Sequence, residues 1–111
     1  MSLIVDPPSC SVPAAGGSST HKLVNFGAEK LIFKIKSSNN SDYRVNPVYG
    51  FIDPAGCRDI VITRTAGLPK EDKIVIHFGA VSTDATDPQA AFATVAPAAT
   101  GTVTIPVSAN V

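Results

Sequence analysis

The segment KLIFKIK, residues 30–36, carries the pattern that decides the fold class. Its large apolar residues recur at every second position, at Leu31, Phe33 and Ile35, and lysines stand at positions 34 and 36. Successive side chains of a strand point to opposite faces, so a period of two predicts a half-buried β-strand. We expect Ile32 and the two lysines on its outer face, which makes that face basic.

Similar segments recur along the rest of the chain, rich in β-branched residues and bounded by Gly and Pro. Pro106 would confine the last of them to a sheet edge or to a non-bonded position. Pro7 and Pro8 interrupt the first, which we interpret as one strand split in two. The predicted strands cover residues 3–12, 20–26, 30–36, 43–45, 57–65, 73–78 and 102–108.

About seven short strands separated by turns favour an all-β fold, a seven-stranded immunoglobulin-like antiparallel β-sandwich. Asp87 followed by Pro88 has the pattern of a helix start, so a single helical turn is an open alternative to a loop there. The run ATVAPAAT, residues 93–100, is interpreted as a loop. The expected core includes Leu31, Phe33, Ile35, Val45, Ile60, Ile62, Ile74, Ile76, Val103 and Ile105.

Length and composition narrow the function class. A chain of 111 residues is expected to form one domain, residues 1–111. Nine basic and nine acidic residues give no net charge, so nucleic acid is not an expected partner. Direct membrane insertion is not expected either, because no apolar run approaches about 18 residues.

The compartment is predicted from the first residues and the cysteines. The opening MSLIVDPPSC lacks the basic start and long apolar run of a secretory signal, so we expect a cytoplasmic protein. Cys10 and Cys57 are therefore expected as free thiols, although a disulfide between them is an alternative.

The sequence offers little for catalysis, so we expect a protein that is not an enzyme. Its only histidines, His21 and His77, are interpreted as surface or strand-end residues. Because neither a Gly-rich phosphate loop nor metal-spaced Cys and His residues occur, no cofactor and no metal site are expected. The remaining carboxylate pairs are interpreted as solvated turn residues: Glu71 with Asp72, and Asp84 with Asp87.

Several motifs in this order resemble the major sperm protein (MSP) domain family. They are Asn25, the segment LIFKIKSS, residues 43–47 (YRVNP), residues 50–54 (GFIDP) and residues 72–74 (DKI), preceded by an opening strand with its proline at residues 3–8. The family comprises nematode major sperm proteins and VAMP-associated proteins of the endoplasmic reticulum. The resemblance covers nearly the whole chain, implies the same seven-stranded sandwich, and suggests a small sperm-specific nematode member.

The resemblance implies two uses of the domain. VAMP-associated proteins bind acidic peptides with paired phenylalanines, called FFAT motifs, in a basic groove. Lysines attract the acidic flank and hydroxyls bond the extended backbone. The alternative is a plain solvated strand face. The peptide-binding positions that match are Lys34, Lys36, Ser37, Ser38, Lys73 and Val75.

Nematode major sperm proteins instead form dimers that polymerise into filaments for sperm motility. This chain resembles them in being a bare domain, whereas a VAMP-associated protein continues into a coiled coil and a membrane anchor. We therefore expect a cytoskeletal component or accessory as the main function. The expected partners are itself, as a homo-oligomer, major sperm protein, or acidic peptides.

Overall fold

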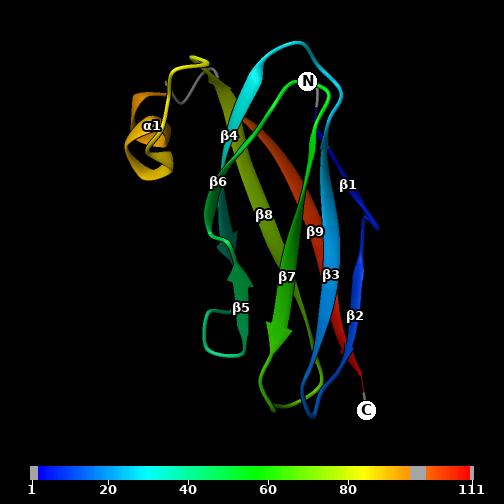
Figure 1. The fold of residues 1–111 in the computed structure, drawn as a ribbon. Helices are drawn as coiled ribbons and strands as arrows, with labels where there is room; N and C mark the ends of the chain where they lie inside the picture. Colours follow the sequence, from blue (N-terminus) through cyan, green and yellow to red (C-terminus); the bar gives the residue numbers. More distant parts are fainter. Residues whose placement is uncertain (1–2, 96–99, 111) are drawn as a thin grey trace.

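Two stacked sheets and one short helix make up the part of the chain that this computed structural model describes, residues 3–95 and 100–110 (Figure 1). The four-stranded sheet has the order β1 (Leu3–Asp6), β3 (Gly17–Asn25), β7 (Cys57–Arg64), β5 (Tyr43–Asn46). The five-stranded sheet has the order β2 (Cys10–Pro13), β9 (Gly101–Asn110), β8 (Lys70–Val81), β4 (Lys30–Ser37), β6 (Tyr49–Ile52). The helix, α1 (Pro88–Thr94), lies outside the five-stranded sheet.

The predicted all-β sandwich is confirmed, but the count of seven strands is wrong for two reasons. The first strand is not one interrupted strand, because β1 pairs with β3 and β2 pairs with β9 in the other sheet. Residues 7–9, with two prolines, connect the sheets and add no ladder of their own. The second reason is β6, which the sequence analysis missed. The fold is also not purely antiparallel, since β2 and β9 run parallel.

Strand β4 shows why the alternating pattern predicted most of the core correctly. Leu31, Phe33 and Ile35 point between the sheets and are buried. Of the ten predicted core residues, Val45 and Val103 are only partly buried and pack against the core, and the other eight are buried. Ile32 was placed on the outer face and is fully buried, because α1 packs on that side of β4.

Of the two alternatives after Asp87, a loop or a helical turn, the structure has a helix, and it extends to seven residues. One Asp87 carboxylate oxygen accepts hydrogen bonds from the backbone N–H groups of Gln89 (3.1 Å) and Ala90 (3.3 Å), and Pro88 opens the helix. Gly79 of β8 lies beneath the other end, where an added Cβ would be 2.5 Å from Cγ1 of Val95. The predicted loop at residues 93–100 therefore begins within α1, and its positions 96–99 lie outside the described residues.

Strand β6 depends on a glycine for its position. Gly50 pairs with Phe33 of β4, and a Cβ on Gly50 would lie 2.8 Å from the Phe33 ring. Any larger residue would have to displace that buried ring. Gly50 thus permits the close approach of an edge strand to the core.

A buried arginine closes one end of the sandwich. Arg64 is 2% exposed, and its guanidinium donates hydrogen bonds to the carbonyl oxygens of Leu68 (2.7 Å) and Ala14 (3.3 Å). It also lies 3.9 Å from the Asp42 carboxylate and over the Tyr43 ring, 5.1 Å from its centre. Arg64 therefore joins three loops at this end, a role that no sequence pattern indicated.

The proline in β9 is accommodated by the register of its neighbours. The strand is not at an edge, since it lies between β2 and β8. Pairing with β2 begins at Val107, one residue after Pro106. The ladder with β2 therefore does not include Pro106, which has no N–H to donate.

Candidate interaction surface

The outer face of the five-stranded sheet brings together most of the predicted peptide-binding residues. Strands β4 and β8 are antiparallel neighbours, and their register pairs Lys34 with His77 and Lys36 with Val75. One step further, the Ser38 backbone N–H donates to the Lys73 carbonyl oxygen (3.0 Å). By strand alternation the side chains of these residues lie on the outer face.

Ser37 is the exception among the predicted residues. It has the same strand phase as the buried Ile35 and is half-buried, and its hydroxyl accepts a hydrogen bond from the Asn39 backbone N–H (3.0 Å). Five of the six predicted residues therefore share one surface, and Ser37 helps to shape the loop at its end.

Ser38 is on this surface but its hydroxyl is already engaged. Its Oγ accepts from the Lys73 backbone N–H (2.9 Å) and donates to an Asp72 carboxylate oxygen (3.1 Å). The other Asp72 oxygen accepts from the Asn39 amide (3.2 Å). The interpretation of Glu71 and Asp72 as turn residues is wrong, because both belong to β8, whose first residue is Lys70.

Aromatic rings hold the lysine at the centre of this surface. Lys34 Nζ lies 5.3 Å from the centre of the Tyr49 ring and 5.9 Å from that of Phe92, and the two rings meet edge to face at 6.2 Å. In such cation–π contacts the ammonium group is attracted to the faces of the rings. Tyr49 comes from β6 and Phe92 from α1, the two elements that the sequence analysis missed or only partly predicted.

His77 occupies the middle of the surface and was rightly placed outward, although it is half-buried. Burial, and to a lesser extent the positive charges of Lys36 and Lys34, lower the pKa of His77. An open pocket of about 310 Å³ lies beside it. The pocket is lined by Lys36, His77, Phe92, Val95, Thr100 and Thr102.

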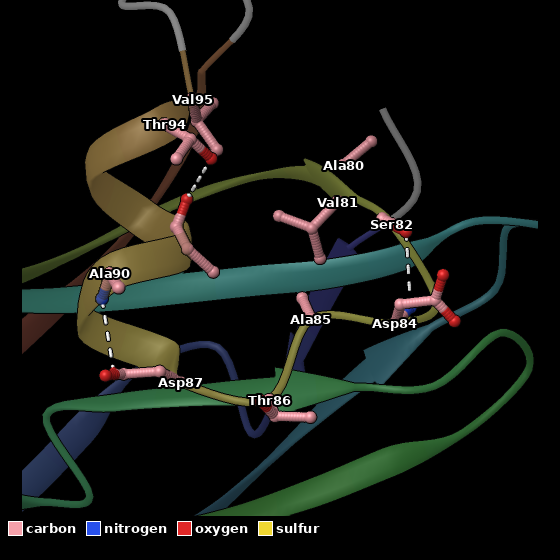
Figure 2. A pocket seen from close by; sticks show the side chains of 11 residues that line it. Ala80, Val81, Ser82, Asp84, Ala85, Thr86, Asp87, Ala90, Thr94 and Val95 are labelled. Atoms are coloured by element: carbon pink, nitrogen blue, oxygen red, sulfur yellow. Dashed lines mark hydrogen bonds between the residues drawn. The ribbon is translucent and has the colours of Figure 1, made fainter.

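A larger pocket of about 510 Å³ lies at the far end of β8, against α1 (Figure 2). Small apolar side chains form most of its wall, among them Ala80, Ala85 and Ala90. Asp87, at its rim, is engaged as the helix cap, and Asp84 is exposed. No sequence pattern indicated this pocket, because its wall combines two strand-end residues with a loop and a helix.

The other histidine has a structural environment. His21 was expected at the surface or a strand end and is instead 1% exposed. Its Nδ1 lies 2.8 Å from the Pro7 carbonyl oxygen, which can only accept, so Nδ1 donates this hydrogen bond, and its Nε2 lies 2.9 Å from Ser19 Oγ. Both ring nitrogens are therefore engaged in fixing the connection between β1 and β2 onto β3.

The two thiols lie in different sheets. Cys10 of β2 is buried and Cys57 of β7 is exposed, and both are free. Within the described ranges we find no cluster of three or more His, Cys, Asp or Glu residues suited to a metal ion. No helix in the same residues is long and apolar enough to span a membrane.

Comparison with known families gives the same answer as the sequence motifs. The family model of the MSP (major sperm protein) domain matches residues 2–101. The chain belongs to the MSP domain family. The motifs at residues 43–47 and 50–54 therefore correspond to β5 and β6 of an MSP domain.

Individual relatives are similar along their whole length. The chain is 74% identical to "Sperm-specific class P protein 9/11" of Caenorhabditis elegans over 99% of both chains. The solved structure of SSP-19, an MSP-domain protein like family member from the same nematode, superposes with a TM-score of 0.91 at 69% identity, covering 96% of this chain and 98% of that one. The structure of WR4, another C. elegans MSP family member, gives a TM-score of 0.89 at 45% identity, with 96% of each chain covered.

Proposed function

We propose that the chain is a non-enzymatic protein-interaction module of nematode sperm, a cytoplasmic component or accessory of the cytoskeleton related to major sperm protein. The observation that carries this proposal is the 74% identity over 99% of both chains to a sperm-specific class P protein. A likeness of that extent leaves room for only small differences in fold.

The arrangement of the polar residues supports a role outside catalysis. Ser19 Oγ and His21 Nε2, 2.9 Å apart, are the nearest approach to a nucleophile beside a base. His21 is buried, however, and neither residue lines any of five pockets on the described part of the structure. A substrate would have no route to the pair, whose hydrogen bonds instead fix the connection between the sheets.

Analytical ultracentrifugation of the chain, alone and with major sperm protein, tests the proposed function. We expect self-association, a complex with major sperm protein, or both, largely insensitive to salt where the contacts are apolar. A strict monomer that neither binds major sperm protein nor alters its filaments would contradict the proposal.

A second candidate function is binding of acidic peptides, favoured by the common face of Lys34, Lys36, Lys73 and Val75. An extended acidic peptide should perturb the NMR amide signals of Ser37, Ser38 and Lys73 together. Each exposed lysine should contribute about 0.2–1 kcal/mol, and binding should weaken as salt rises.

Substitution of Val75 sharpens that test. Val75→Met should strengthen binding if the peptide inserts an apolar ring there, because the longer thioether fills irregular space. Thr104→Met, on the neighbouring position of β9, is the matched control. Scattered perturbations, or none at millimolar peptide, would leave the lysine face as a solvated surface.

A further inference from the structure

The outer face of the four-stranded sheet carries an ordered set of exposed side chains that the functions above do not use. The register of β1, β3, β7 and β5 arranges them in rows across the strands. From one end to the other, the rows are Ile4–Val24–Cys57, Asp6–Lys22–Asp59, Thr20–Val61–Asn46 and Ser18–Thr63–Arg44. All of these residues except the half-buried Val24 are exposed.

Apolar groups stand on both sides of the charged row. Ile4 is 50% exposed and Val61 is 36% exposed, which places both among the five exposed large hydrophobic residues of the described chain. Phe26, 60% exposed, follows directly after β3. Ile4 and Val61 therefore leave apolar surface on this face, and burying part of it favours a protein contact.

The charged row is complementary to itself. Lys22 on β3 lies between Asp6 on β1 and Asp59 on β7, and among the described residues it makes no ion pair within 4.0 Å. A second copy can face the first across a two-fold axis that runs along the strands between β3 and β7. Each β3 residue of one copy then faces the β7 residue of the same row in the other copy. Lys22 of each copy therefore faces Asp59 of the other, which gives two such contacts.

The remaining rows are compatible with the same arrangement. Val24 faces Cys57 and Thr20 faces Val61, so apolar groups meet small or apolar ones. Asp6 lies on β1 and Arg44 on β5, in different rows, so neither side chain faces a like charge of the other copy. With the axis tilted slightly from the strand direction, the two sheets cross at about 30° and lie about 10 Å apart, as twisted sheets do when they pack face to face.

The opposite face would not pair with itself in this way. The five-stranded sheet presents four outward lysines, at positions 30, 34, 36 and 73, against one carboxylate, Glu71, and α1 covers part of it. Two such faces would bring like charges together, which is costly at an interface. Charge therefore favours the four-stranded sheet over the five-stranded one for a contact between two copies of the chain.

We propose that two copies of this chain associate through the outer faces of their four-stranded sheets, with Lys22 of each copy opposite Asp59 of the other. This inference rests on the proposed assembly function and names its contact surface. It makes the interface isologous, with the same residues contributed by both copies.

Charge exchange tests the contact in the full chain, under reducing conditions, by sedimentation equilibrium over a range of concentrations. Lys22→Glu and Asp59→Lys should each weaken dimerisation by at least about tenfold, since each places like charges opposite one another twice. The double variant should return to within about threefold of the wild type. Lys36→Glu, the same charge change on the other face, should leave dimerisation unchanged.

Val61→Asp supplies a test that does not depend on the lysine. Its row neighbours Thr20 and Asn46 are uncharged, so the change creates no repulsion within one copy, and we again expect at least about tenfold weaker dimerisation. Thermal unfolding of Val61→Asp should match the wild type, since the position is exposed and its row is uncharged, so any loss of dimerisation in this variant reports the contact and not the fold.

The outcomes separate this inference from the proposed function. A wild-type chain that stays monomeric at about 1 mM, or a Lys22→Glu variant that dimerises as well as the wild type, would overturn the contact surface proposed here. Binding to major sperm protein in the same samples would still support the function. Loss of dimerisation in Lys36→Glu but not in Lys22→Glu would assign the contact to the other sheet.

Discussion

The outer faces of the two sheets differ although both sheets have the same alternation of buried and exposed residues. The five-stranded face is partly covered by α1 and carries lysines, two of which lie over aromatic rings. The four-stranded face has no helix on it in the described structure and alternates acid and base across its strands. The alternating pattern thus determines which residues enter the core. What each outer face can contact depends instead on whether a helix covers it and on how its charged side chains are arranged.

The largest expected effect on stability concerns the core between the two sheets. Phe33 is fully buried between the sheets, so Phe33→Ala should lower the free energy of unfolding by about 3–5 kcal/mol. Urea unfolding followed by circular dichroism measures it. A loss under about 1 kcal/mol would show that β4 has the opposite face toward the core.

The next effect removes the helix from the five-stranded face. A Cβ at Gly79 would lie 2.5 Å from Cγ1 of Val95, so Gly79→Ala should cost about 1–3 kcal/mol and loosen α1. Amide exchange of Ile32, beneath the helix, should accelerate. Adding Val95→Ala should restore most of the loss, and an unchanged single variant would show that α1 does not pack closely there.

A smaller effect tests how α1 begins. Asp87→Ala removes the acceptor for two backbone N–H groups and should cost about 1 kcal/mol, measured by thermal unfolding. Asp87→Asn keeps an acceptor oxygen and should stay within a few tenths of a kcal/mol of the wild type. Equal losses in both variants would mean that the carboxylate charge, rather than the cap, stabilises the helix.

The smallest expected effect is a change in the pKa of His77, which depends on the charge of the five-stranded face. The pKa of His77 is lowered from its ordinary 6.5 by burial, then by Lys36 and Lys34. An NMR titration should show the pKa of His77 rising in Lys36→Gln and unchanged in Lys22→Gln, on the other sheet. A pKa that moves equally in both variants would contradict the separation of the two faces.

The same shift gives a dependence of stability on pH. Because the pKa of His77 is lower in the folded chain than in the unfolded one, the unfolded chain takes up the proton first. The contribution of His77 is therefore complete above about pH 6.5 and is lost as the pH falls below that value toward the folded pKa. His77→Gln should remove this contribution, which is detectable as a smaller loss of thermal stability between pH 7 and pH 5.

The sequence predicted what depends on local alternation and missed what depends on contacts distant in the chain. The period of two located β4 and its core residues, and Asp87 with Pro88 located the start of α1. Ile32 was misplaced because its cover comes from a helix more than 50 positions away. His21 and Arg64 were missed as core residues because their partners, Pro7, Ala14 and Leu68, lie in other segments.

The candidate site shows the same limit. Its strand residues were found from the motif, and their common face followed from the pairing of β4 with β8. Its aromatic residues Tyr49 and Phe92 were not found, since they come from the unpredicted β6 and from α1. The rows on the four-stranded sheet could not be predicted from the sequence either, because they depend on the register of four separate strands.

An NMR dilution series of the wild-type chain tests most directly the claim that the two faces have different uses. The account predicts that amide shifts change with concentration at Lys22, Asp59 and Val61, and stay constant at Lys36 and Val75. The first three residues lie on the outer face of the four-stranded sheet and the other two on that of the five-stranded sheet. Changes confined to Lys36 and Val75, or spread equally over both faces, would contradict it.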